Sequence, residues 1–105
     1  MTYQIPRSVT LQKFIPVTGA TVTVQPSDSP VIGVMLNNVG LLATLTLQLP
    51  ITGLPGQLIR VTFNGAITLL SYTGGTVLGG IAVAAANGYI AFIYDDTNSV
   101  WRRCA

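Results

Sequence analysis

Side chains that carry acid–base chemistry are nearly absent from this sequence. The 105 residues include no histidine and only three acidic residues, Asp28, Asp95 and Asp96. General acid–base catalysis needs a proton-transfer group of tunable pKa, most often a histidine or a pair of carboxylates. Asp95 and Asp96 are adjacent, so they would point to opposite faces of a strand or cap backbone amides in a turn. We therefore expect a protein that is not an enzyme and has no small-molecule substrate.

Charge of either sign is also scarce. Charged residues make up 8% of the chain, whereas ordinary domains contain about 25%. Apolar residues make up 50%, and the mean hydropathy is +0.60. The uncharged window from Thr76 to Tyr94 is long enough for a membrane helix, but Asn87-Gly88 is a turn signal inside it. We expect no membrane contact, and instead a soluble protein that covers its apolar surface by forming oligomers.

Cysteine is represented once, by Cys104. No internal disulfide can form, and no histidine is present to activate this thiol as a nucleophile. We expect no signal peptide at the N-terminus, because Pro6, Arg7 and Lys13 interrupt any apolar run there. These features predict synthesis in the cytoplasm.

Motifs for metals, phosphates and nucleic acids are missing as well. Asp96-Thr97-Asn98 begins like a calcium loop but lacks its glycine and its final glutamate. The double glycines at 74–75 and 79–80 are not followed by the Lys-Ser/Thr of a phosphate-binding loop. Arg102-Arg103 is the only basic cluster, and no row of stacking aromatics accompanies it. We expect no metal, no cofactor and no nucleic-acid partner.

What the sequence has in abundance is strand periodicity. Apolar and polar side chains alternate in several segments, and no segment has convincing helical periodicity. Asn64-Gly65 favours a tight hairpin between two of these segments. The expected strands cover residues 9–14, 20–25, 31–36, 40–49, 58–63, 67–70 and 89–94. The predicted fold class is all-β, a compact antiparallel sandwich or jelly-roll-like barrel of short strands.

A faint internal similarity accompanies these strands. Pro16-Val-Thr-Gly19 recurs as Pro50-Ile-Thr-Gly53, and Gly40-Leu-Leu-Ala-Thr-Leu is similar to Gly65-Ala-Ile-Thr-Leu. Two short matches do not establish a repeat architecture. They agree with a chain built from similar β-units.

Two parts of the chain are candidates for contact with other molecules. Residues 1–15 are expected to form an extended N-terminal arm, and residues 16–105 a single β-domain. The candidate partner-binding residues of the arm are Tyr3, Ile5, Arg7 and Lys13, with a frayed terminus as the alternative. The candidate surface or ligand residues of the domain are Tyr89, Trp101 and Arg102. Trp101 and Arg102 could stack at a binding surface, or Trp101 could close the core and leave Arg102 exposed.

The C-terminal half carries an ordered set of motifs. Phe63-Asn-Gly-Ala-Ile-Thr-Leu69 is followed by a Gly-rich span, an Ala-Asn-Gly-Tyr turn, the strand Ala91-Phe-Ile-Tyr-Asp-Asp96 and Trp101-Arg102. This order resembles a small β-module that recurs in virion proteins of tailed bacteriophages, mainly tail fibres, tailspikes and related head or tail appendages. The resemblance covers residues 55–103. The matching residues are Gly65, Ala66, Thr68, Leu69, Gly88, Phe92, Tyr94, Asp95 and Trp101, whereas Tyr89 stands where the family usually has an acidic residue.

The resemblance implies a homotrimeric virion component without catalytic activity. The family usually carries this module at the end of a long chain, whereas we expect no fibrous shaft to accompany it here. The leading hypothesis is therefore a capsid decoration (cement) protein, located in the virion, that binds further copies of itself and the major capsid protein or another virion protein. One alternative is a tail-fibre, tailspike or connector module for host recognition. The other is a small carbohydrate-binding module with Tyr72, Tyr89 and Trp101 as stacking residues.

Overall fold

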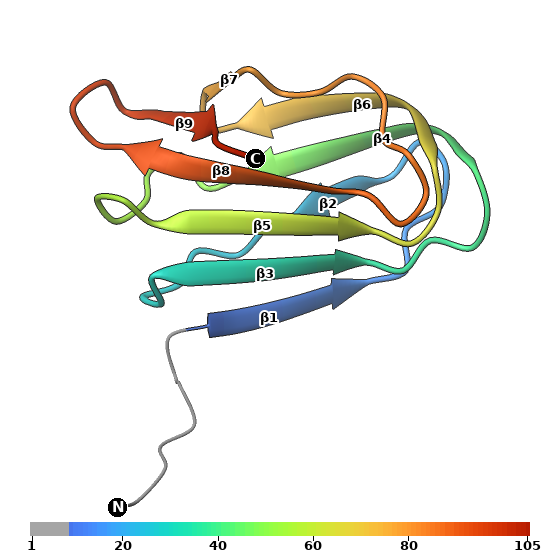
Figure 1. Cartoon of the computed structure of the whole chain (residues 1–105), viewed down its shortest axis with the longest axis horizontal. Coiled ribbons are helices and arrows are strands. Elements are labelled where there is room, and N and C mark those ends of the chain that lie inside the picture. Colours follow the sequence, from blue (N-terminus) through green and yellow to red (C-terminus); the bar gives the residue numbers. More distant parts are fainter. Residues whose placement is uncertain (1–8) are drawn as a thin grey trace, which may run out of the picture.

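The structure, a computed structural model, describes residues 9–105 as two β-sheets without a helix (Figure 1). Sheet A has six strands in the order β1-β3-β5-β8-β9-β7, and sheet B has three in the order β2-β4-β6. The strands are β1 (Val9–Phe14), β2 (Thr21–Thr23), β3 (Val31–Leu36), β4 (Leu42–Leu49), β5 (Leu58–Phe63), β6 (Ile67–Gly74), β7 (Val77–Leu78), β8 (Tyr89–Asp95) and β9 (Val100–Arg103). The all-β prediction is confirmed.

The first six strands form three stacked coils of a solenoid-like structure. In each coil the chain runs along a strand of sheet A, turns a corner and returns along a strand of sheet B (Figure 1). The pairings β1–β3–β5 and β2–β4–β6 are all parallel. In sheet B, Thr21 pairs with Thr46 and Leu42 with Ile67, so corresponding residues are 25 positions apart.

The predicted antiparallel sandwich or jelly-roll-like barrel is therefore wrong in its pairing. Asn64-Gly65 lies at a corner between β5 and β6, which belong to different sheets, and does not close a hairpin. Gly65 is needed there because a Cβ atom would meet the Gly40 carbonyl and the Asn38 amide of the coil below. The similarity between the segments that begin at Gly40 and Gly65 thus has the same 25-residue spacing as the pairing of β4 with β6.

The core lies between the two sheets and follows the predicted alternation. The inward side chains of β3 and β5 are fully buried, and those of β4 pack against them. The fully buried aliphatic and aromatic members include Ile32, Leu36, Leu45, Leu47, Ile59, Phe63, Ile67, Ile90, Phe92 and Trp101. Burying each large side chain of this kind is worth about 1.5–3 kcal/mol relative to leaving it exposed.

The last strands close one end of the coils. β8 pairs antiparallel with β5, β9 pairs antiparallel with β8, and β7 pairs parallel with β9. Residues 82–84 lie along the outer edge of β6, where Ile67 and Ala84 exchange backbone hydrogen bonds of 2.9 and 3.0 Å. The edge of sheet B is thereby partly paired at this end of the molecule.

The first coil has an inverted pattern. The inward side chains of β1 include Thr10, whose hydroxyl forms hydrogen bonds of 2.7 and 2.6 Å with those of Ser27 and Ser29. Gln12 exchanges side-chain hydrogen bonds with the backbone of Gln25 at 2.9 and 2.8 Å. The outward side chains of β1 are those of Val9, Leu11 and Lys13, whereas Phe14 lies on the inward side with Thr10 and Gln12 and packs against the core. β1 also lies within the stretch that the sequence assigned to the arm, so residues 9–14 belong to sheet A.

Membrane-spanning helices were not expected from the sequence. Residues 9–105 contain no helix that is long and apolar enough to cross a bilayer.

Candidate binding groove

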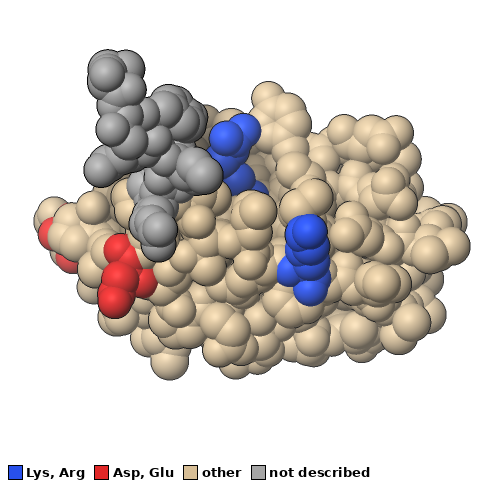
Figure 2. Space-filling view, turned by 90° about the horizontal axis from the view of Figure 1, so that it is seen from below, with Lys and Arg blue, Asp and Glu red and all other residues tan. Residues whose placement is uncertain are grey.

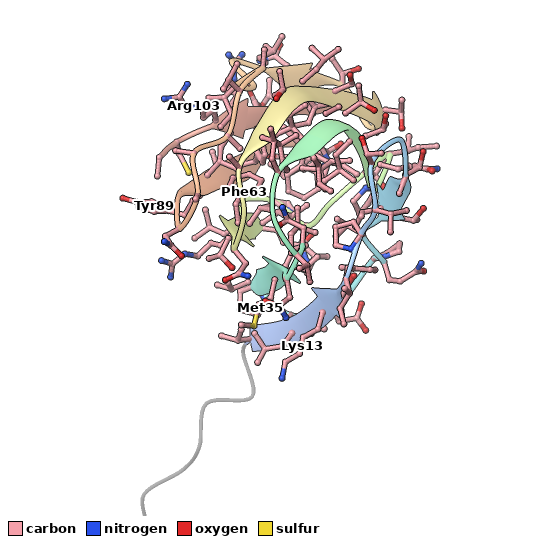
Figure 3. The ribbon with its side chains drawn as sticks, turned by 90° about the vertical axis from the view of Figure 1, so that its right-hand side faces the viewer. Lys13, Met35, Phe63, Tyr89 and Arg103 are labelled. Carbon is pink, nitrogen blue, oxygen red and sulfur yellow. The ribbon has the colours of Figure 1, made fainter. Side chains whose placement is uncertain are left out.

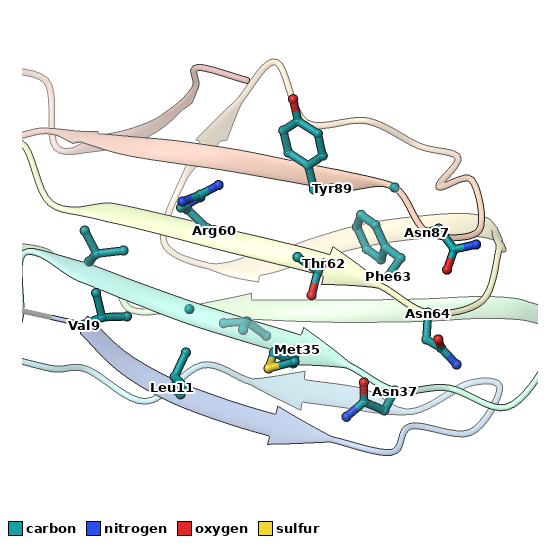
Figure 4. A pocket seen from close by; sticks show the side chains of 14 residues that line it. Val9, Leu11, Met35, Asn37, Arg60, Thr62, Phe63, Asn64, Asn87 and Tyr89 are labelled. Atoms are coloured by element: carbon teal, nitrogen blue, oxygen red, sulfur yellow. The ribbon is translucent and has the colours of Figure 1, made fainter.

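A groove lies on the outer face of sheet A (Figure 4). It has a volume of about 600 Å³ and crosses β1, β3, β5 and the start of β8. Its lining is Val9, Leu11, Val31, Gly33, Val34, Met35, Asn37, Arg60, Thr62, Phe63, Asn64, Asn87, Gly88 and Tyr89. We call this feature the sheet A groove.

The inverted pattern of β1 and a glycine on β3 together shape the groove. Val9 and Leu11 point outward from β1, with exposed fractions of 46% and 61%. Leu11 pairs with Gly33, and a Cβ atom on Gly33 would lie 2.8 Å from Leu11 Cδ2. The Leu11 side chain therefore leans over the bare backbone of Gly33. Half-buried Met35 continues the apolar floor toward the corner.

Polar groups line the other side of the groove. Arg60 is exposed on β5 and points toward the space beside Tyr89, whose ring is 63% exposed (Figure 4). Asn37, Asn64 and Asn87 lie where the strands end (Figure 4). Asn87 has a φ of 60°, in the left-handed region that asparagine tolerates better than most residues. The groove thus offers apolar contact, amide hydrogen bonding and one cation.

The outer face of sheet B has a different character. Its outward side chains are mainly hydroxyls and amides in register across the three strands, as in the rows Thr21–Thr46–Ser71 and Thr23–Gln48–Thr73. Such groups are well hydrated and need no covering. The apolar outer surface lies on sheet A.

The predicted site residues are spread over separate parts of the molecule. Tyr3, Ile5 and Arg7 lie outside the described residues. Lys13 is exposed on β1, two positions after Leu11 and on the same outward side of the strand. Tyr89 lines the groove. Arg102 lies on β9, where its Nε donates a hydrogen bond of 2.8 Å to Asp95 Oδ2. Lys13 and Tyr89 are thus on the same sheet face, and Arg102 is not part of the groove.

The prediction that Trp101 belongs to a surface for ligand binding is wrong. Its exposed fraction is 0%, and its Nε1 donates a hydrogen bond of 2.8 Å to the Pro50 carbonyl. Its ring packs edge-on against Tyr94, with 4.9 Å between the ring centroids. Trp101 therefore closes the core and leaves Arg102 exposed, as the alternative reading had it.

Tyr72, a predicted stacking residue, is half-buried. Its hydroxyl donates a hydrogen bond of 2.8 Å to the Ile81 carbonyl, and its ring packs edge-on against Phe92. Burial raises the pKa of Tyr72 to about 12, because the phenolate would lose its hydration there. Among the predicted stacking residues, only Tyr89 lies in the groove.

The Asp95-Asp96 segment forms a turn, as the sequence predicted. Asp95 Oδ1 accepts hydrogen bonds from the backbone amides of Thr97 and Asn98 at 3.1 and 3.3 Å. Hydrogen bonds from the Asn98 side chain and then from Arg102 lower the pKa of Asp95 to about 2. Within residues 9–105, no three His, Cys, Asp or Glu side chains gather as metal ligands do.

Comparison of the chain with protein-family models, curated proteins and solved structures finds no match.

Two features of the groove were missed by sequence reasoning. Val9 and Leu11 were assigned to an arm, although their alternation with Thr10 and Gln12 already separated an apolar from a polar side of that strand. Gly33 was treated as an ordinary strand residue, although a glycine inside a strand often marks the close approach of another group. Which side of β1 faced the core could not be read from the alternation alone.

Proposed function

We propose that this protein is a non-enzymatic structural protein of a virion, a homotrimeric decoration protein that binds the outer surface of the capsid shell. The observation that carries the proposal is the sheet A groove, an apolar concavity on a face built from hydrogen-bonded strands. Val9 and Leu11 leave apolar surface of the groove open to water, and burying that surface against a protein partner is favourable. The order of motifs in residues 55–103 supports the virion context.

Charge supports the same surface. Arg60 is exposed in the groove and Lys13 beside it, while acidic side chains gather at one end of the molecule seen in Figure 2. The partner that fits the groove is an apolar protein segment with a carboxylate placed opposite Arg60. A guanidinium pairs with a carboxylate through two parallel hydrogen bonds when the geometry allows.

The experiment is re-binding to particles. Virions that carry the gene are purified on a density gradient and should contain the protein in the head-containing fraction. Particles stripped of the protein, or made without it, should bind added protein. The Leu11→Asp variant places a charge in the apolar wall of the groove and should lose most of this binding.

The matched control is Leu78→Asp on β7. Leu78 is 43% exposed, and β7 is separated from the groove by β9 in sheet A. This variant should bind particles as the unmodified protein does. Absence of the protein from particles overturns the proposal. Binding to tails instead of heads favours the tail-fibre or connector alternative.

A second candidate function, carbohydrate binding, is favoured by the polar side of the groove. The exposed Tyr89 ring and the Asn37, Asn64 and Asn87 amides are groups that can stack against a sugar and bind its hydroxyls. A glycan array tests it with the Tyr89→Ala variant as control. Glycan binding that depends on Tyr89, without particle binding, would replace the decoration role.

A further inference from the structure

We propose that copies of this chain bind one another through the end of the molecule where the coils turn from sheet A to sheet B. This surface, the corner end, consists of residues 14–20, 37–41, 64–66 and 84–88. The proposal rests on the homo-oligomeric state included in the proposed function and assigns that state a surface. The corner end is distinct from the sheet A groove, which lies on the flat of the sheet, although Asn37, Asn64, Asn87 and Gly88 border both.

The corner end exposes aliphatic side chains to an unusual degree. The exposed fractions are 75% for Ile15, 68% for Val17, 86% for Val39 and 67% for Leu41. Single exposed aliphatic residues are common on soluble proteins, but their concentration on adjoining segments marks an interaction surface. These four residues come from two neighbouring segments, 14–20 and 37–41.

The segments that carry these residues are held side by side by backbone hydrogen bonds. Asn37 N donates to the Phe14 carbonyl at 2.8 Å, which joins the first corner to the second. Leu42 N donates to the Ala66 carbonyl at 2.9 Å, which joins the second corner to the third. Phe63 N donates to the Gly88 carbonyl at 2.9 Å and brings in the fourth segment. All four lie on the right-hand side of Figure 1, and Figure 3 looks directly at them.

Polar groups of the corner end are largely satisfied within the chain. The buried Asn38 side chain donates to the Gly40 carbonyl at 3.0 Å and accepts from Gly65 N at 3.2 Å. The Thr18 hydroxyl accepts from the amides of Ala43 and Thr44 at 3.1 and 3.2 Å. Covering this surface would therefore remove few unpaired polar groups from water, which keeps the desolvation cost low.

Charge points to a second copy of this chain as the occupant. The four segments contain no Asp, Glu, Lys or Arg. In a symmetric assembly equivalent surfaces meet around an axis, so a charge on the contact surface is brought close to its own copies. An uncharged aliphatic surface avoids this repulsion. In Figure 3 the basic residues Lys13 and Arg103 lie at the rim of the view, outside the corner end.

The other surfaces of the described structure suit self-association less well. The sheet A groove holds Arg60, the opposite end of the molecule holds Asp28, Asp95 and Asp96, and the outer face of sheet B is lined by hydrated hydroxyls. The loop of residues 50–56 is also uncharged and exposes Ile51 and Leu54, but it borders a hollow that includes Asp28.

The test is the mass of the full chain by light scattering over a range of concentrations. The unmodified protein should form an oligomer whose mass is a multiple of 11.0 kDa. Val39→Asp and Val17→Asp each place a carboxylate in the corner end. Each should move the concentration for half-association upward by at least about 10-fold, because like charges would then meet across the contact.

The matched control is Ile51→Asp. Ile51 is 76% exposed, as the corner residues are, but lies in the loop between β4 and β5 at the opposite end of the molecule (Figure 1). The Ile51→Asp variant should form an oligomer of the same mass as the unmodified protein. Circular dichroism should show that all three variants are folded.

Three results overturn the inference. They are an unmodified protein that remains at 11.0 kDa, corner variants that still associate, and an Ile51→Asp variant that dissociates equally. Absence of the protein from virions would instead overturn the proposed function and leave these masses unaffected.

Discussion

Asn38 is the residue on which the stacking of the corners depends most directly. It is fully buried, and its side chain bonds to the backbone of its own corner and to that of the next coil. A buried polar group without its partner costs about 1–3 kcal/mol. Asn38→Ala leaves the Gly65 amide without its acceptor, so we expect the free energy of unfolding to fall by about that amount in urea denaturation.

Its neighbour supplies the control for that measurement. Asn37 is exposed, so Asn37→Ala should change the free energy of unfolding by less than about 0.5 kcal/mol. Equal losses in the two variants would show that Asn38 has no special role in the corner.

Tyr72 gives the stability of the protein a dependence on alkaline pH. The phenol has an ordinary pKa of 10.0 and a pKa of about 12 in the folded chain. Above pH 10 the unfolded chain gives up this proton more readily than the folded one, so its contribution to stability is complete below pH 10 and is lost as the pH rises toward 12. We expect the free energy of unfolding to fall between pH 10 and about pH 12, and the fall to be shallower in Tyr72→Phe.

Tyr89→Phe is the control for Tyr72→Phe because it removes an exposed phenol. Urea denaturation at several pH values measures both. A pH dependence that changes equally in the two variants would contradict the assignment to Tyr72.

Residue burial was predictable where a strand has one apolar side. The inward positions of residues 40–49 and 58–63 follow from alternation, and the structure confirms them. Alternation did not predict the burial of Asn38. The burial of a polar residue depends on its hydrogen-bond partners, which for Asn38 are Gly40 and Gly65, 2 and 27 positions further along the chain. Trp101 was ambiguous for the same reason, since its partner is the Pro50 carbonyl.

At the scale of the elements, close packing of successive corners requires a glycine. Gly65 does not have a positive φ, so its role is steric: a Cβ atom would meet the Gly40 carbonyl and the Asn38 amide. Gly65→Ala should push two corners apart and lower the free energy of unfolding by more than about 1 kcal/mol.

Gly40→Ala is the comparison for Gly65→Ala. Gly40 has a φ of 75° and no atom within 4 Å of an added Cβ, so the substitution costs only backbone strain. That strain is about 1–2 kcal/mol. Thermal and urea unfolding compare the stabilities of the two variants. Adding Asn38→Ala should reduce the loss of stability caused by Gly65→Ala, but not the loss caused by Gly40→Ala. Equal relief in both would contradict the steric account.

The pairing of the elements was beyond local sequence rules. The strands at 9–14, 31–36 and 58–63 have the predicted bounds, but period-two alternation does not identify a strand's neighbour. Asn64-Gly65 suits a hairpin turn and a coil corner equally. The sequence signal for this pairing was the similarity between the segments that begin at Gly40 and Gly65. The two segments are 25 residues apart, as are the paired residues of β4 and β6, but the similar stretch is short and occurs only once.

For the whole molecule, β1 marks where truncation begins to matter. Deletion of residues 1–8 keeps every described strand in the chain, so we expect the shortened protein to fold and to form an oligomer of the same number of subunits. Deletion of residues 1–14 removes β1, its hydrogen bonds to Ser27, Ser29 and Gln25, and its pairing with β3.

The longer deletion should lower the midpoint of thermal unfolding by several degrees, since a loss of 1 kcal/mol shifts it by about 4–8 °C in a domain of this size. Differential scanning calorimetry compares the two truncations. If the shorter deletion alone dissociates the oligomer, self-association depends on residues 1–8 and not on the corner end.

The parallel coils also make this molecule extensible. Each coil contacts only the coils next to it, and one coil uses about 25 residues: paired residues are 25 positions apart in sheet B and 22 or 27 apart in sheet A (Val9 with Val31, Val31 with Leu58). Duplication of one such stretch, for example by unequal recombination, would add one strand to each sheet and lengthen the stack by about 4.8 Å. The closing strands β8 and β9 and the polar first coil could remain as they are. Growth of this kind would widen the groove and the corner end in equal steps, so reach and contact area could evolve by whole coils instead of by single residues.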